Sequence, residues 1–207
     1  MKVHATFSAL VLAGLCAAGA GYAADAKAPA SAAKAPEPSA QEKAWAEWMQ
    51  KNVPGDPHKL LAQNAGEWTI SVKTWMTPDA QPTTSAGTSS TKMILDGRYL
   101  QETSSGDMGG FPFSGQGLTA YDNASKKYEA TWVDNMSTAI FHCDGTYDAG
   151  SKSLTMNGMT YDPAAGKDVA VKTVTRFVDD KSHVFEWWGP DPSGKMFKSM
   201  EITYTRK

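Results

Sequence analysis

The spacing of hydrophobic residues changes at Trp68. Before it, apolar side chains recur three or four residues apart, as at Trp45 and Trp48, which is the period of a helix. After it, apolar and polar side chains alternate over short stretches, which is the period of a strand with one buried face. The pattern therefore predicts helices over residues 39–66 and a domain of strands over residues 67–207.

Two helices are predicted in the first of these regions. Ser39 and Glu42 have the spacing of a capping box and begin the first helix. Asp56 followed by Pro57 begins the second, and Gly66 is expected to end it as a C-terminal glycine. The apolar stripe of the first helix predicts that it packs on the strand domain, and a lid or a membrane-surface element is the alternative.

The remainder of the chain contains about ten short strands separated by turns rich in Asp, Gly, Pro and Ser. Asp96-Gly97 is the strongest hairpin signal, residues 144–152 form another turn region, and the glycine-rich stretch Ser105–Gly110 is expected to be a mobile loop. Short links favour antiparallel pairing of successive strands. The predicted fold is therefore all-β: a single antiparallel up-and-down barrel preceded by one or two short helices.

The first 23 residues have the pattern of a secretory signal peptide. A weakly basic start is followed by an apolar run over residues 7–18 and by a small-x-small cleavage site at residues 21–23. Residues 24–38 are rich in Ala, Pro and Lys and are expected to form a disordered linker. The protein is therefore predicted to be exported, to the periplasm or the extracellular space, with no transmembrane segment left after cleavage.

Composition excludes some classes of function. The formal net charge is −2, and the sequence has no basic stripe of the kind that binds a nucleic acid. Removal of the signal peptide leaves Cys143 as the single cysteine, so an internal disulfide cannot form and stability must come from the core. Cys143 is expected to be a buried spectator thiol.

Residues on both sides of the strand domain resemble the calycin barrels, which include lipocalins, fatty-acid-binding proteins and haem-binding nitrobindins. Gly66-x-Trp68 follows a short helix, an antiparallel meander comes next, and Arg206 lies near the end. In lipocalins a tryptophan of the first strand packs against an arginine of a late strand at the closed end of the barrel. The resemblance implies that Trp68 and Arg206 have these two roles.

A closer resemblance is to a bacterial family known as domain of unknown function 1579, and it covers residues 58–206. The matching pieces are His58-x-x-Leu61, Gly66-x-Trp68, Asp96-Gly97-Arg98-Tyr99-Leu100, Gly115-x-Gly117 with Tyr121-Asp122, and Trp132-x-Asp134. This resemblance implies a fold and not an activity.

The many aromatic and methionine residues point to a cavity. A barrel of about ten strands is wider than its side chains readily fill, which favours a site for a small apolar or amphipathic molecule. Methionine adapts to varied apolar ligands. The residues predicted to line this site are Trp132, Trp187, Tyr99, Tyr128 and Met200.

Two alternatives stay open from the sequence. A haem-binding redox protein of nitrobindin type would use His183 or His142 as its iron ligand, and a structural or interaction module would have a filled barrel. Catalysis is disfavoured: adjacent strand residues such as His142 and Cys143 point to opposite faces and cannot act as a base and nucleophile pair. We therefore predict no catalytic residues and no cofactor, with haem as the runner-up, and leave the oligomeric state open.

Overall fold

The computed structural model describes residues 37–207, which contain two helices followed by ten strands. The helices are α1 (Ala40–Lys51) and α2 (Asp56–Ala62). The strands are β1 (Gly66–Thr74), β2 (Thr83–Ile94), β3 (Tyr99–Met108), β4 (Phe111–Asp122), β5 (Lys127–Asp134), β6 (Phe141–Asp148), β7 (Ser153–Asp162), β8 (Lys167–Phe177), β9 (Ser182–Pro190) and β10 (Met196–Arg206). The predicted signal peptide and most of the predicted linker lie outside the described residues.

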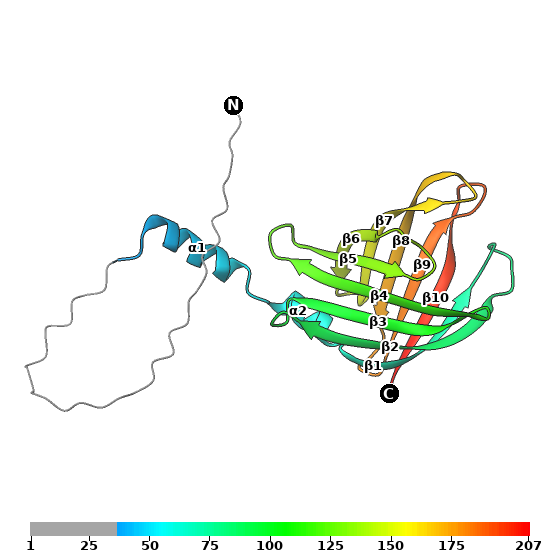
Figure 1. The fold of residues 1–207 in the computed structure, drawn as a ribbon, viewed down its shortest axis with the longest axis horizontal. Helices are drawn as coiled ribbons and strands as arrows, with labels where there is room; N and C mark the ends of the chain where they lie inside the picture. Colours follow the sequence, from blue (N-terminus) through cyan, green and yellow to red (C-terminus); the bar gives the residue numbers. More distant parts are fainter. Residues whose placement is uncertain (1–36) are drawn as a thin grey trace, which may run out of the picture. The chain divides into compact units, whose positions relative to one another are not determined.

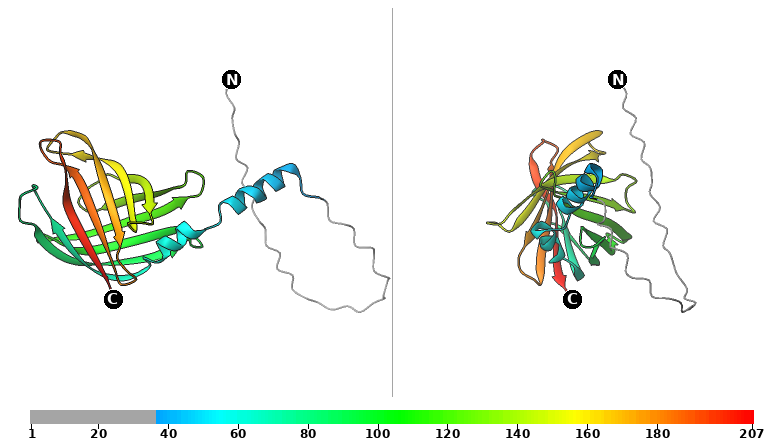
Figure 2. Two further views of the ribbon diagram at one scale, coloured as in Figure 1. Left: turned by 180° about the vertical axis from the view of Figure 1, so that it is seen from behind. Right: turned by 90° about the vertical axis from the view of Figure 1, so that its left-hand side faces the viewer.

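The ten strands form one closed antiparallel barrel (Figure 1, Figure 2). Each strand pairs with the next in the sequence, and β1 also pairs with β10, which closes the barrel. The predicted up-and-down topology is therefore confirmed, and every strand has a neighbour on both sides. Neither helix within residues 37–207 is long and apolar enough to cross a membrane.

The two ends of the barrel differ. The connections β1–β2, β3–β4, β5–β6, β7–β8 and β9–β10 lie at one end, which we name the open end. Helix α2 contacts β2, β3 and β4 at the other end, which we name the closed end (Figure 1). Leu61 of α2 is 1% exposed and lies in a core cluster with Leu100, Tyr128, Leu154 and Met156. The helix is therefore a plug that buries the apolar residues of the closed end.

A contact between the first and last strands closes the barrel beside this plug. Trp68 of β1 is opposite Arg206 of β10, and the guanidinium carbon lies 4.2 Å from the centre of the Trp68 ring. The three donor groups of this arginine bond the backbone carbonyl oxygens of Gln63, Ala65 and Asp180 at 2.8, 2.8 and 2.7 Å. The stacked pair expected from the sequence thus also joins β10 to the α2–β1 connection and to the β8–β9 turn.

Gly66 has a different role from the one predicted. Helix α2 ends before it, with Gln63 as the C-cap residue, so Gly66 does not terminate the helix. It is the first residue of β1 and has a φ of 148°, a conformation that favours glycine. A Cβ at this position would collide with Nη1 of Arg206. Glycine is required because the arginine packs directly against the backbone here.

The stretch Ser105–Gly110 is not the loop that the sequence predicted. β3 continues to Met108, and only Gly109 and Gly110 form the turn, at φ values of 67° and 92°. Within the strand, Gly106 lies so close to β2 that a Cβ would be 2.8 Å from a backbone carbonyl oxygen. The loop prediction is wrong because glycine here permits close approach of two strands.

The predicted turn region at residues 144–152 is also strand in its first half. β6 continues through Gly145, where a Cβ would collide with the carbonyl oxygen of Thr155 in β7. Close approach of neighbouring strands again explains the glycine. Asp96-Gly97, in contrast, does lie in the turn between β2 and β3, and both residues have positive φ.

Helix α1 does not pack on the barrel as predicted. All of its residues are exposed, and the rings of Trp45 and Trp48 stack on each other with centroids 4.9 Å apart. The side-chain amide of Asn123 donates to the carbonyl oxygens of Lys51 and Val53 at 2.9 and 3.0 Å, which holds the segment where the helix ends. The apolar stripe therefore reflects stacking of the two tryptophans on each other and not burial in the core.

We expect the stability effects of Trp68→Ala and Arg206→Ala to be coupled. Trp68→Ala should lower the free energy of unfolding by about 3–5 kcal/mol, because the ring is 1% exposed. Arg206→Ala removes the stack and three donors and should cost about 2–4 kcal/mol. Denaturant unfolding of the wild type, both single variants and the double variant measures the coupling energy. Losses that simply add would show that the two side chains do not interact.

Candidate functional site

Four of the five residues predicted to bind a ligand lie on the inner face of the barrel. Trp187 is opposite Met200 in the register of β9 and β10, and Tyr128 and Trp132 lie on one face of β5. Tyr128 is 4% exposed in the core under α2, whereas the other three are half-buried nearer the open end. The fold therefore brings Trp132, Trp187 and Met200 to one half of the lumen and uses Tyr128 for packing.

Tyr99, the fifth of these residues, lies on the outer face. It precedes Leu100, which is 7% exposed and packs in the core, and adjacent strand residues point to opposite faces. Tyr99 instead lines a hollow on the outside of the barrel wall. The sequence alone does not show whether an aromatic residue at the start of a strand points to the inner or the outer face. The burial of its neighbour decides this.

Burial of the large apolar residues of the inner face decreases from the closed end to the open end. The inward residues near α2 and the Arg206 stack are buried, namely Trp68, Ile70, Leu100, Tyr128, Leu154, Met156 and Tyr204. Large inward residues nearer the open end remain partly accessible, namely Val72, Trp132, Phe141, Phe185, Trp187, Met200 and Ile202. Two smaller inward residues beside them, Thr173 and Val171, are buried at 2% and 3% exposed. The large apolar residues of the inner face are thus packed at the closed end and partly accessible toward the open end.

The accessible half of the lumen has an aromatic wall. The rings of Phe141 and Trp187 lie with centroids 4.7 Å apart. The indole of Trp132 packs on Gly115, where a Cβ would collide with it, and its Nε1 donates a 3.0 Å hydrogen bond to Asp134. Each ring is positioned by a neighbour, so the lumen offers preformed apolar surfaces.

Exposed apolar side chains gather on the connections at the open end. Seven large apolar residues there are between 40% and 80% exposed, and we name them the open-end rim: Met76, Met108, Phe111, Met136, Ile140, Tyr161 and Met196. They come from all five open-end connections or from the strand ends beside them. A gathering of exposed apolar side chains is typical of a surface that meets a ligand or another apolar surface.

A half-buried carboxylate lies on the inner face of β3, between the buried residues Leu100 and Ser104. Glu102 follows the buried Leu100 by two residues, a parity signal that the sequence prediction missed. Its Oε1 accepts hydrogen bonds from Ser89 and Ser104 at 2.8 Å each and from Tyr204 at 3.1 Å. Burial and the Glu102 carboxylate raise the pKa of Tyr204 well above its usual value, so this hydroxyl stays protonated and remains a donor.

The other oxygen of this inner-face carboxylate has no hydrogen-bond partner within residues 37–207. Among residues 37–207, Oε2 of Glu102 accepts no hydrogen bond, and no Lys or Arg pairs with this side chain. Its neighbour in β4 is Gly117, and beyond Gly117 lies the Trp132 ring of β5. Glu102, which is half-buried, and Trp132 are therefore separated on the inner face by Gly117, which places no side chain between them.

His183, one of the two predicted haem ligands, is a packing residue of the closed end. Its ring stacks on Tyr204 with centroids 4.2 Å apart and meets Trp68 edge-on at 4.6 Å, and its Nδ1 is buried with no hydrogen-bond partner in residues 37–207. Burial, with Arg206 nearby, lowers the pKa of His183 to about 4. An axial ligand must present a ring nitrogen to a space that holds the haem, and the packing of His183 does not fit that requirement.

His142, the other predicted haem ligand, lies outside the lumen. It is exposed on the outer face of β6, while its neighbour Cys143 is 8% exposed and points into the core. Burial raises the pKa of the Cys143 thiol to about 11, so the sulfur is protonated at neutral pH. No group of three or more His, Cys, Asp or Glu side chains within residues 37–207 is placed to hold a metal ion.

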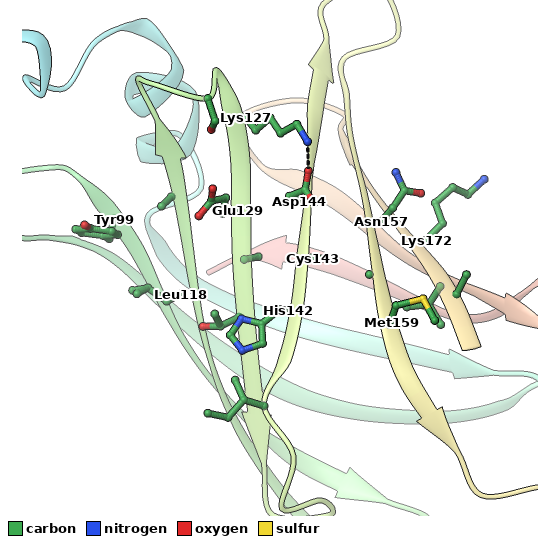
Figure 3. A pocket seen from close by; sticks show the side chains of 18 of the residues that line it. Tyr99, Leu118, Lys127, Glu129, His142, Cys143, Asp144, Asn157, Met159 and Lys172 are labelled. Atoms are coloured by element: carbon green, nitrogen blue, oxygen red, sulfur yellow. Dashed lines mark hydrogen bonds and ion pairs between the residues drawn. The ribbon is translucent and has the colours of Figure 1, made fainter. Parts of the chain in front are cut away.

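A broad hollow lies on the outer face of the wall formed by β4–β8 (Figure 3). Its polar residues include Glu129, His142, Asn157 and Lys172, which come from four different strands and do not converge on one point (Figure 3). Convergent polar groups in an apolar setting are typical of small-molecule sites. The outer hollow is therefore a weaker candidate than the lumen.

Glu186 shows how a carboxylate is satisfied on the outer face. Its Oε1 accepts from Arg176 and Lys198, and its Oε2 accepts from the indole of Trp188 at 3.0 Å. Burial alone would raise the pKa of Glu186, but these donors lower it. Lys198 also pairs with Glu201. The sequence revealed no partners for these two glutamates because the pairs depend on the alignment of β8, β9 and β10.

Residues 53–206 match the family described as "Protein of unknown function (DUF1579)". The chain belongs to this family. It is the family named above from the sequence motifs, and its description assigns no activity. No curated protein sequence matches the chain.

A solved structure agrees with the fold. The structure titled "Crystal Structure of Rv2717c from M. tuberculosis" has a TM-score of 0.55 and 14% identity to this family member, and the match covers 74% of this chain and 99% of that one. A redesigned β-barrel has a TM-score of 0.37 and 15% identity, with 72% and 94% covered. At 14% identity the first similarity concerns the fold alone. The TM-score of the second is too low to show a shared fold.

We expect Cys143 to react slowly in the folded protein. The pKa of about 11 lowers the thiolate fraction at neutral pH by about 100-fold relative to an ordinary cysteine. Thiol titration in native buffer should therefore show little labelling, and the same reagent should label the sulfur promptly in denaturant. Rapid labelling of the folded protein would contradict the burial of this residue.

The burial of His183 should make stability fall on mild acidification. Its pKa is about 4 in the folded protein against 6.5 in an ordinary histidine, so the unfolded chain takes up the proton first as the pH falls. The contribution of His183 is therefore complete above pH 6.5 and is lost by the time the pH reaches about 4. The loss amounts to at most about 3 kcal/mol.

A variant pair isolates this effect. His183→Phe keeps an aromatic ring in the stack but cannot titrate, so its free energy of unfolding should fall less between pH 6.5 and 4 than that of the wild type. His142→Phe is the matched control, because His142 is exposed on the outer face. Denaturant unfolding at several pH values measures both. If the free energy of unfolding of His183→Phe depended on pH as that of the wild type does, this explanation would be wrong.

Proposed function

We propose that the protein binds a small apolar or amphipathic molecule in the accessible half of its barrel lumen. The observation that carries the proposal is the set of partly accessible aromatic residues on the inner face toward the open end, beyond the packed core under α2. A purely structural barrel would gain stability by filling this half with apolar side chains. The lumen therefore favours a binding protein over the filled-barrel alternative.

The open-end rim supports a route for such a molecule. Its seven apolar residues flank the end at which the lumen is accessible. Four of them are methionines, whose flexible side chains adapt to varied apolar partners. A ligand that enters here would remain in contact with apolar surface from the rim to Trp132 and Trp187.

The residues of the lumen support binding rather than catalysis. Asp134 near the open end is held by the Trp132 indole and by the backbone amides of Met136 and Ser137. The Cys143 thiol is protonated and buried. A nucleophile needs an oriented base and access to a substrate. The hydroxyls of Ser89 and Ser104 do donate to the Glu102 carboxylate, but both serines are buried, at 1% and 3% exposed.

Export remains part of the proposal. The amino-terminal 23 residues have the signal-peptide pattern and the following linker is rich in Ala and Pro, which supports delivery to the periplasm or the extracellular space. A mature domain with one cysteine is compatible with an oxidising compartment, because it cannot form a wrong internal disulfide.

Native mass spectrometry of the protein purified from its source compartment should detect a non-covalent mass in addition to the polypeptide. Trp132→Ala and Trp187→Ala should each weaken retention of this ligand by about tenfold to a hundredfold, because a large apolar contact is lost. His142→Ala, on the outer face, is the control and should retain it. A bare polypeptide mass would favour the filled barrel. Loss of the ligand in His142→Ala alone, with a haem-type visible absorption band, would favour the haem protein.

A further inference from the structure

We propose that the ligand of the lumen carries a cationic nitrogen, such as an alkylammonium group, that pairs with the Glu102 carboxylate. This inference rests on the proposed lumen-binding function and adds the chemical class of the ligand. The observation that carries it is a half-buried carboxylate on the inner face, one oxygen of which accepts no hydrogen bond from residues 37–207.

The hydrogen bonds of Glu102 fix the orientation of its side chain through Oε1 and leave Oε2 able to accept from a ligand. Three hydroxyl groups, from Ser89, Ser104 and Tyr204, all donate to Oε1. The rotamer is therefore held from one side, and Oε2 is left without a partner among residues 37–207. A carboxylate in such a setting gains from a donor, and it gains most from a charged one.

The charges on the inner face favour a ligand with a positive charge. No Lys or Arg within residues 37–207 forms an ion pair with Glu102. Arg206, a cation of the closed end, is occupied by three carbonyl oxygens and the Trp68 ring. No ion pair within residues 37–207 thus offsets the negative charge of Glu102, and a positively charged group would offset it.

The aromatic neighbour favours the same chemistry. Gly117 lies between Glu102 and Trp132 in the three adjacent strands and leaves the path between them free of side chains. An ammonium group bound to the carboxylate would lie beside the indole, and a cation beside an aromatic face is stabilised further. An alkyl chain attached to that nitrogen would extend toward Phe141, Trp187 and the open-end rim. The ligand class is therefore a cationic amphiphile.

Three probes with the same alkyl chain test the inference: decylammonium, decanol and decanoate, each below its aggregation concentration. Binding to the purified protein at neutral pH is measured by calorimetry and by the change in tryptophan fluorescence. Decylammonium should bind about tenfold to a hundredfold more tightly than decanol, because it adds a charge-assisted hydrogen bond. Decanoate should bind most weakly, because it adds a second negative charge.

Two glutamate variants assign the preference to one residue. Glu102→Gln should lose the preference for decylammonium over decanol. Glu129→Gln is the matched control, because Glu129 is exposed on the outer face of β5, and it should keep the preference. If Glu102→Gln does not give the circular dichroism spectrum of the wild type, Glu102→Asp replaces it, and its shorter side chain should reduce the preference without reversing it.

The outcomes separate this inference from the proposed function. Equal affinities for the three probes, or a preference for decylammonium that persists in Glu102→Gln, would overturn the inference and leave lumen binding in place. Tightest binding of decanoate would overturn it as well. Failure of all three probes to bind the folded protein would overturn the lumen-binding function together with the inference.

Discussion

The barrel depends on how Arg206 joins the first and last strands. A meander of ten strands would leave β1 and β10 as open edges, and their pairing removes both. Arg206 reinforces that pairing because its planar guanidinium stacks on Trp68 and bonds carbonyl groups of separate segments. Two of these carbonyls, at Gln63 and Ala65, follow the end of α2, where the backbone lacks helical partners. One side chain thus fixes the first strand, the plug helix and the β8–β9 turn.

Closure at one end allows the other end to remain accessible. The apolar cluster around Leu61 and the one around Trp68 both contain residues of the closed end, so much of the buried apolar surface is concentrated there. Gly115 and Gly117 contribute backbone and no side chain to the lumen wall, and the Trp132 ring packs against them. The open half therefore does not have to be filled for the chain to fold, and its aromatic surfaces can serve a ligand.

The sequence predicts this barrel well where alternation is regular and poorly where glycine interrupts it. Trp68 and Arg206 could be paired in advance because strand parity and antiparallel order place them together. The sequence wrongly predicts a turn at Gly145 and a mobile loop at Ser105–Gly110, because glycine permits both an irregular segment and the close approach of two strands. Glu102 was missed because its donors come from three strands whose alignment the sequence does not state.

The partners of Glu102 and Glu186 explain why the lumen is the stronger candidate site. Both carboxylates are partly or wholly withdrawn from water, which is costly for a charge without partners. Glu186 has both oxygens satisfied by its own sheet, through two cations and an indole. Glu102 has hydroxyl donors on one oxygen and takes part in none of the ion pairs of residues 37–207. A charge that the protein offsets needs nothing further, whereas a donor on the proposed ligand would stabilise the charge of Glu102, which hydroxyl groups satisfy from one side.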